Sequence, residues 1–322
     1  MNSIKLVRYG ELIPCKTAFI DAHTPGSDQK ENFTIIGGGV SESPDQHVHI
    51  EETPGFNIGA AGQPPKCRNS LHTHRTAEVF FVLSGRWRFF WGRWGTAGEV
   101  VLEEGDIFNI PTGIFRGFEN IGTDYGMIMA ILGGDDAGGG VVWAPQVIEE
   151  ASHHGLILTE NGKLVNTVKD EQLDEGVQEM RALDDEELAR FPEPPVEAIV
   201  PGYIARYQDL MALSARQAVH VIGDGAIIQD TPGFDCHFLS THSIPETTFV
   251  FDKPEVYIVM RGHWIIDCGG KKTSLAPGDT AWIPAGSERC LYPSMSGEAS
   301  LYRVRSNDDP AGLTQGFIGG HS

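Results

Sequence analysis

The feature that most constrains the fold of this 322-residue chain is an internal repeat. The tetrapeptide TPGF occurs at residues 53–56 and again at residues 231–234. In each copy it is followed by a Glu that six residues separate from a Gly, at residues 78–85 and 255–262. Landmarks that keep their order and spacing indicate two copies of one fold. The later shared landmarks are Gly-Asp, Pro-x-Gly and an Arg, at residues 105–116 and 278–289.

Short segments rich in aliphatic and aromatic residues dominate both copies. Segments such as EVFFVLSG, from residue 78, and EVYIVMRG, from residue 255, end at Gly or another turn residue, which is typical of strands in a barrel or sandwich. Between the copies the chain is acidic, has helical spacing and ends in a cluster of prolines. We therefore predict an all-β protein with β-rich domains at residues 1–150 and 206–322, joined by a short helical, acidic linker at residues 151–205.

Composition limits the compartment and the partners. The formal net charge of -20 would repel nucleic acid and anionic membrane surfaces. The five cysteines are an odd number without C-x-x-C spacing, which is typical of reduced thiols in a cytosolic protein. The N-terminus lacks the apolar core of a signal peptide, and no apolar run is long enough to span a bilayer. We therefore expect a cytoplasmic protein with no nucleic-acid or membrane partner.

Three residues of the first copy have the pattern of metal ligands. In SLHTHRTAEVFFVLSG, His72 and His74 are two positions apart, so a strand would direct both imidazoles to one face. Glu78 is again an even number of positions away, so a continued strand would direct its carboxylate the same way. Two imidazoles and a carboxylate suit a divalent first-row metal ion.

These motifs resemble those of the cupin superfamily. H-x-H, three residues, Glu, six residues and Gly resembles the first cupin motif, and GDIFNIPTGIFRGFEN, at residues 105–120, resembles the second. With two copies, the chain resembles a bicupin of the quercetinase and gentisate dioxygenase type. The resemblance implies two jelly-roll-type β-barrels and a metal ion held by His72, His74 and Glu78 in the first. It implies iron as the first choice, with manganese, nickel or zinc as alternatives.

The chain departs from the family pattern at several positions. Lys66 stands where the first motif begins with Gly, and Arg116 stands where the second motif has its histidine ligand. Arg116 cannot bind a metal, because its guanidinium stays protonated. In the second copy Phe249 and Phe251 replace the two histidines, and only Glu255 remains. We therefore expect the second barrel to lack metal ligands and to be structural.

Arg116 leaves two interpretations open. In the first, three ligands form the facial triad of non-haem Fe(II) oxygenases, and Arg116 has a catalytic role beside an open coordination position, where it binds a substrate carboxylate or stabilises an oxyanion. In the second, Arg116 pairs with Glu78, as Arg289 would pair with Glu255, and the metal is lost. Two histidines kept at ligand spacing favour the metal site, because a buried imidazole needs partners.

The leading functional interpretation is a mononuclear metal-dependent dioxygenase that acts on a small organic acid or phenolic compound in the first barrel. Two alternatives stay open: a non-catalytic protein that binds a small anion through Arg116, and a metal-dependent isomerase or decarboxylase that needs no O₂. Cupins host many chemistries, so fold resemblance alone does not choose among them. Barrel edges and aromatic strands favour a homodimer.

Two other sets of residues have a structural and a functional interpretation. His47 and His49 form a second H-x-H, followed by acidic residues, which could lie at a pocket rim but is better explained by a solvated edge strand. Trp87, Phe89 and Trp91 alternate on one strand face and could line a pocket for a flat substrate. We expect them to pack in the barrel core or at a dimer contact instead.

Overall fold

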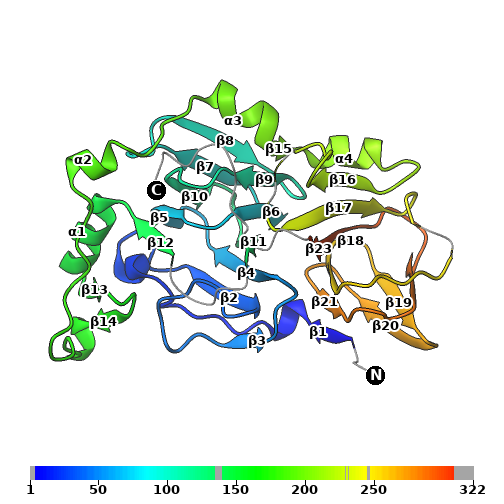
Figure 1. The fold of residues 1–322 in the computed structure, drawn as a ribbon, viewed down its shortest axis with the longest axis horizontal. Helices are drawn as coiled ribbons and strands as arrows, with labels where there is room; N and C mark the ends of the chain where they lie inside the picture. Colours follow the sequence, from blue (N-terminus) through cyan, green and yellow to red (C-terminus); the bar gives the residue numbers. More distant parts are fainter. Residues whose placement is uncertain (1–3, 135–139, 229, 231, 245–246, 308–322) are drawn as a thin grey trace.

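The computed structural model describes residues 4–134, 140–228, 230, 232–244 and 247–307. Two β-rich halves lie side by side, the first drawn from blue to green and the second from yellow to red, with the helices along the outer edge (Figure 1). The predicted all-β fold of two jelly-roll-type units is confirmed. We call these units the first and the second barrel.

The first barrel consists of two facing sheets. One has seven strands in the order β15-β9-β6-β11-β4-β2-β3, and the other has five in the order β12-β5-β10-β7-β8. Trp87, Phe89 and Trp91 are fully buried between them, as expected for core residues. The strands are β2 (Glu31–Ile36), β3 (Val48–Ile50), β4 (Phe56–Gln63), β5 (Arg68–His74), β6 (Glu78–Ser84), β7 (Trp87–Trp91), β8 (Gly98–Leu102), β9 (Ile107–Ile110), β10 (Arg116–Asn120), β11 (Gly126–Gly133), β12 (Val141–Trp143) and β15 (Ile204–Ala205).

The second barrel repeats this plan with fewer strands. Its larger sheet has the order β1-β21-β18-β23-β17-β16, and its smaller sheet has the order β20-β19-β22. The strands are β1 (Lys5–Val7), β16 (Val219–Ile222), β17 (Phe234–Ser240), β18 (Glu255–Arg261), β19 (Trp264–Cys268), β20 (Lys271–Leu275), β21 (Thr280–Ile283), β22 (Arg289–Pro293) and β23 (Ser300–Ser306).

Short helices and one small hairpin connect these sheets. A capping box, in which Asp184 and Glu187 bond to each other's backbone, begins α2. No helix in the described ranges is both long and apolar enough to cross a membrane. The elements are α1 (Pro145–His153), α2 (Asp185–Leu188), α3 (Val196–Tyr203), α4 (Tyr207–Leu213), the 3₁₀ helices η1 (Tyr9–Glu11), η2 (Ile20–His23) and η3 (Thr167–Lys169), and the hairpin β13 (Leu156–Leu158) and β14 (Leu164–Asn166).

The backbone confirms the register of the repeat. Arg116 pairs with His72 across β10 and β5, and Arg289 pairs with Phe249 at the same place in the second barrel. Thr231, which begins the second TPGF, lies outside the described residues. The repeated glycines all have positive φ, between 68° and 91°, so L side chains are disfavoured there. These glycines are Gly85, Gly105, Gly113, Gly262, Gly278 and Gly286.

Each half also sends a strand into the other half's sheet. β1, near the N-terminus, pairs with β21 of the second barrel, and β15, at the end of the predicted linker, pairs with β9 of the first barrel. We call these strands and the Arg-Tyr that follows each of them the crossing arms. The predicted boundaries at residues 150 and 205 stay a prediction, and strand pairing runs across them in both directions.

The same contacts anchor both crossing arms. Arg8 Nη1 donates to Asp279 Oδ2 at 2.6 Å, and the Tyr9 amide donates to Asp279 Oδ1 at 3.0 Å. In the other arm, Arg206 Nη1 and the Tyr207 amide donate to the two carboxylate oxygens of Asp106, at 2.7 and 2.9 Å. The repeat therefore includes VRYGEL from residue 7 and ARYQDL from residue 205, two segments that our sequence analysis did not align.

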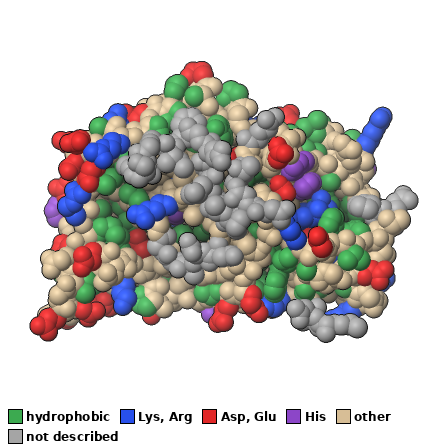
Figure 2. Space-filling view, viewed as in Figure 1, with side chains coloured by type: hydrophobic (Ala, Val, Ile, Leu, Met, Phe, Trp, Pro, Cys, Tyr) green, Lys and Arg blue, Asp and Glu red, His purple; other side chains and the backbone are tan. Residues whose placement is uncertain are grey.

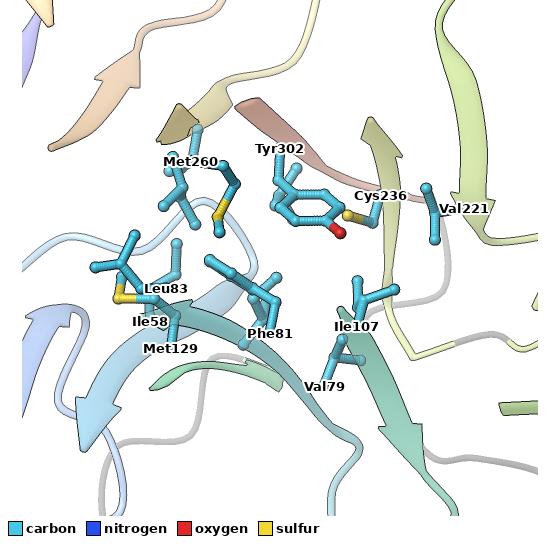
Figure 3. Close-up of a cluster of buried hydrophobic side chains, with 14 of the residues drawn as sticks. Ile58, Val79, Phe81, Leu83, Ile107, Met129, Val221, Cys236, Met260 and Tyr302 are labelled. Carbon is cyan, nitrogen blue, oxygen red and sulfur yellow. The ribbon is translucent and has the colours of Figure 1, made fainter. Parts of the chain in front are cut away.

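The two barrels share one hydrophobic core. Phe81 on β6 and Met129 on β11 face Met260 and Tyr302 of the second barrel (Figure 3). Tyr302 Oη also donates to the Gly105 carbonyl at 2.7 Å. The large sheet of each barrel therefore has two buried faces, one toward its own interior and one toward the other barrel.

Candidate metal centre

The three predicted ligands come from the two facing sheets of the first barrel. His72 and His74 end β5 in the five-stranded sheet, and Glu78 begins β6 in the seven-stranded sheet. The three-residue connection at 75–77 carries the chain from one sheet to the other, so all three side chains meet in the interior. Their ligand atoms lie within 4.8 Å of one another, and all three residues are buried.

Both imidazoles have the protonation state that a metal ligand needs. Burial, and then the positive charge of Arg116, lowers the pKa of His72 and of His74 well below the usual value. Both rings are therefore neutral at pH 7. His72 Nδ1 lies 2.7 Å from the Ser70 carbonyl, which fixes the tautomer and leaves Nε2 as an acceptor.

The surroundings of His74 fit a bound cation. Its Nδ1 is buried and has no hydrogen-bond partner among the described residues, while its Nε2 lies 3.5 Å from Glu78 Oε2. A buried imidazole nitrogen without a partner loses the free energy of a hydrogen bond to water. A donor set of two neutral imidazoles and one carboxylate, with one unsatisfied ring, therefore fits a divalent metal ion.

Arg116 occupies the position of the missing fourth ligand. Its guanidinium is buried, pairs with Glu78 Oε2, and donates from Nη1 to the His72 carbonyl at 3.4 Å. Burial raises the pKa of Glu78, and the charge of Arg116 opposes that rise. Arg116 does not line the cavity described next, so a direct contact with substrate stays a prediction. The ion pair occupies one carboxylate oxygen and leaves the other for a metal.

A cavity of about 70 Å³ lies beside the three ligands. It is larger than the roughly 10–15 Å³ that one buried water needs, and smaller than the ~150 Å³ cavity that holds benzene in an engineered protein core. In this conformation it suits a small molecule better than an aromatic ring. Its polar wall residues besides the ligands are Asn32, Thr34, Ser41, Gln46 and Asn69.

Two of these wall residues present polar atoms that have no hydrogen-bond partner within the described ranges. They are Asn32 Nδ2, from β2, and Gln46 Oε1, from the loop before β3. A donor and an acceptor are therefore both available to a bound molecule. Our sequence analysis missed both residues, because neither belongs to a motif, and one polar residue in a strand such as ENFTII carries no functional signal.

A buried carboxyl group supports the wall beside His72. The Trp143 ring lies 5.3 Å from the His72 ring, and its Nε1 donates to Glu42 Oε1 at 2.6 Å. Glu42 also accepts from the Ile20 amide at 2.8 Å. Burial raises the pKa of Glu42 to about 7 despite these two donors. Sequence analysis missed this contact too, because Glu42 and Trp143 are 101 positions apart.

The second H-x-H lies on an edge strand, as expected. β3 is the last strand of the seven-stranded sheet, and His47 just before it is exposed. Both ring nitrogens of His49 contact backbone groups, the Thr34 carbonyl at 2.7 Å and the Ile13 amide at 3.1 Å. Among the described residues, His72, His74 and Glu78 form the one group of three side chains able to hold a metal ion.

In the second barrel, an ion pair lies where the first has its candidate site. Glu255 and Arg289 are fully buried and paired, as the sequence predicted. The Phe249 and Phe251 rings lie 5.0 and 5.3 Å from the Arg289 guanidinium carbon. Aromatic faces and a cation therefore replace the two imidazoles.

The class of protein follows from this fold and from a comparison of sequences. The family described as "Cupin domain" matches residues 62–132, which include all three ligand candidates and Arg116. The match indicates a cupin domain at residues 62–132, and the two-barrel fold is similar to that of a bicupin.

Solved structures with low sequence identity share this fold. The salicylate 1,2-dioxygenase from Pseudaminobacter salicylatoxidans has a TM-score of 0.54 and 14% identity, over 94% of this chain and 84% of that chain. The protein Ylba from E. coli has a TM-score of 0.50 and 10% identity, over 94% and 90%. No curated protein sequence matches significantly. At identities this low the comparison shows a common fold only, and the activity has to be inferred from the residues of the site.

Proposed function

We propose that this protein is a metal-dependent enzyme whose first barrel binds one divalent first-row metal ion through His72, His74 and Glu78. The proposed reaction is dioxygenation of a small organic acid. The observation that carries this proposal is the convergence of two neutral imidazoles and a carboxylate within 4.8 Å beside a cavity. We further propose iron as the metal, and a cytoplasmic homodimer.

Arg116 supports an anionic substrate indirectly. Because its positive charge already neutralises Glu78, a divalent ion bound here keeps two uncompensated charges. A carboxylate or enolate of the substrate supplies the missing negative charge, which favours an acid over a neutral compound. In this role Arg116 is a positioning residue that holds the Glu78 carboxylate.

The other residues of the site bind and orient the substrate. A bound metal ion supplies coordination positions for O₂ and for the substrate carboxylate. Asn32 Nδ2 and Gln46 Oε1 offer a donor and an acceptor from residues that line the cavity. The small cavity limits the number of water molecules beside the reacting atoms.

The first experiment is metal analysis of the purified protein by elemental mass spectrometry. We expect close to one iron per chain in the wild type and a loss of at least tenfold in His74→Ala. His47→Ala is the matched control, because it removes an exposed histidine of the other H-x-H and should retain the metal. Oxygen uptake by the Fe(II)-loaded protein is then measured with a panel of small organic acids.

One observation favours a second candidate function. The buried Arg116–Glu78 pair already satisfies part of the donor set, as Arg289 and Glu255 do in the second barrel. If the wild type refuses Fe(II), Mn(II), Ni(II) and Zn(II), the metal proposal is wrong, and a metal-free protein that binds a small molecule becomes the better explanation. Arg116→Met separates the two cases. It should raise metal affinity if Glu78 is a ligand, and leave it at zero otherwise.

A further inference from the structure

One cluster in the interior of the second barrel contains more arginines than carboxylates. Arg289 on β22 and Arg303 and Arg305 on β23 surround one carboxylate, that of Glu255. Arg289 is 1% exposed and Arg303 is 8% exposed, while the Arg305 side chain is 19% exposed. Among the described residues, Glu255 is the one carboxylate within 4.0 Å of these guanidiniums. Three positive charges therefore lie within ion-pair distance of one negative charge, and Asp235 pairs in register with Arg305 across β17 and β23.

The guanidiniums of Arg303 and Arg305 have unused donors. Arg289 pairs with Glu255 and donates to the Ser287 carbonyl at 2.7 Å. Arg305 uses Nε for Glu255, but its Nη2 is buried without an acceptor in the described ranges. Arg303 has no hydrogen bond there, and its Nε remains 3.7 Å from Glu255 Oε1. Burying a cation without hydrogen bonds lowers the stability of the fold, unless a ligand supplies acceptors for its N–H groups.

A neutral histidine lies beside these cations. His237 on β17 pairs in register with Arg303. Burial, and then the charge of Arg303, lowers the pKa of His237 to about 3, so the ring is neutral at pH 7. Its Nδ1 is also buried without a partner in the described part of the chain. Burial, and for Arg303 the charge of Arg305, lowers the pKa of both arginines to about 10, and both stay protonated at pH 7.

Arg303, Arg305 and His237 take the places of apolar residues in the first barrel. In the first barrel, Glu78 pairs with Leu132, and the next inward residue on that strand is Ala130, which pairs with Gly59. In the second barrel the equivalent positions hold Glu255, Arg305, Arg303 and His237. Gly59, Ala130 and Leu132 line the small cavity of the first barrel. The second barrel therefore carries polar, cationic groups at the positions that form the apolar cavity wall in the first.

The cluster reaches the surface through Arg305 and Phe251. The Arg305 guanidinium carbon lies 3.2 Å from the centre of the Phe251 ring, and both residues line a depression of about 320 Å³. Lys253 lies on its rim, with the carboxylates Asp235 and Asp252. On the face drawn in Figure 2, histidine and Lys or Arg side chains lie together over the region of β17 and β18.

We propose that the second barrel binds a small anion with a carboxylate or phosphate group, held by Arg305, which lines the depression, and by Arg303 and His237, the next cross-strand pair on the same face of the sheet. A bound anion supplies acceptors for the unused donors of Arg303 and Arg305 and adds negative charge beside three guanidiniums. The rim carboxylates and the net charge of -20 disfavour a large polyanion. The second barrel thus lacks the histidines of the first and holds an anion site on the same face of the corresponding sheet.

The test measures thermal unfolding and isothermal titration with inorganic phosphate and with succinate, at ionic strength held constant with NaCl. We expect a saturable rise in Tm and measurable binding heat with at least one of the two anions. The anion that binds more tightly distinguishes a phosphate ligand from a carboxylate ligand. An absence of both signals with both anions would refute the anion site.

Arg303→Leu tests the assignment without removing a partner of Glu255 that forms a hydrogen bond. Because it removes one of three repelling buried charges, it should leave the Tm without anion unchanged or higher, and weaken anion binding about tenfold or more. Arg261→Leu is the control, since Arg261 is a half-exposed residue of β18 and should leave the response intact. Equal anion responses in wild type and Arg303→Leu, or a large drop in Tm without anion, would mean that the arginines are structural. If Arg303→Leu does not fold, Arg305→Gln replaces it in the binding assay.

Discussion

Lys66 has a backbone conformation that L residues rarely adopt. Its φ is 67°, at the position where the first cupin motif has glycine. The left-handed conformation costs a residue with a Cβ roughly 1–2 kcal/mol. Lys66→Gly should therefore raise the free energy of unfolding by about 1 kcal/mol, measured by urea denaturation. Asp170, at φ 60°, is the control, because Asp tolerates this region better and Asp170→Gly should gain less. A loss of stability in Lys66→Gly would contradict the interpretation.

Glu42 should make stability depend on pH. Its pKa is about 7 in the folded state, against 4.5 for a glutamate in water, so the folded chain holds a proton that the unfolded chain releases between these values. The contribution is fully present below pH 4.5 and is lost as the pH rises through 7. Between pH 5 and 8, the free energy of unfolding of wild type should fall by about 3 kcal/mol more than that of Glu42→Gln. Parallel curves for the two proteins, measured by urea denaturation at several pH values, would show that Glu42 does not titrate there.

Sequence reasoning found the residues of the site that motif spacing specifies, and no others. His72, His74 and Glu78 were identifiable because they lie within seven positions on two consecutive strands. Asn32 and Gln46 reach the same cavity from a strand and a loop earlier in the chain. Their contribution depends on which strands face each other across the barrel. Neither residue type nor local spacing in the sequence indicates that arrangement.

At the scale of elements, the crossing arms depend on two equivalent aspartates. Asp279 accepts from the Tyr9 amide, the Arg8 guanidinium and the Ala276 amide, and Asp106 has the corresponding contacts in the other barrel. Asp279→Asn should lower the free energy of unfolding by about 2–3 kcal/mol, because charge-assisted hydrogen bonds are lost and an NH₂ donor replaces one of the two accepting carboxylate oxygens.

Asp106→Asn is the matched variant, and we expect a loss of the same size. Both are measured by urea denaturation. A loss in one variant only would mean that the two arms are not equivalent.

The strands of the barrels were predictable from their apolar residues and from the turn residues between them, whereas the crossing arms were not. β1 and β15 have three and two residues, and their partners lie about 275 and 100 positions away in the sequence.

At the scale of the whole molecule, the shared core should make the two barrels unfold together. Phe81 is fully buried and contacts the Tyr302 ring of the second barrel at 5.0 Å between ring centres. Phe81→Ala should lower the free energy of unfolding by about 3–5 kcal/mol. Because the core is shared, fluorescence, which reports mainly on the first barrel through four of the six tryptophans, and far-UV circular dichroism should follow one coincident transition. Two separate transitions would show that the barrels are independent domains.

The sequence predicted two barrels and a linker but not this common core. The segment of β6, EVFFVLS, indicates that both faces of its sheet are covered, and six consecutive residues of this strand are indeed buried. A strand with one solvated face would alternate apolar and polar residues, so an unbroken apolar run indicates that both faces are covered. The sequence does not say what covers the second face, because another sheet, a helix or a second subunit would produce the same pattern.

The crossing arms also set an order of events during synthesis. β1 is made before the rest of the first barrel, but β21, its partner, follows about 270 residues later. At roughly 5–20 residues per second, the ribosome needs roughly 15–50 s to deliver it. During that interval the arm has no sheet to join, and the first barrel also lacks β15 at its edge until the linker has emerged. The nascent chain therefore carries unpaired strand edges for many seconds, which makes it a candidate for chaperone protection before it is complete.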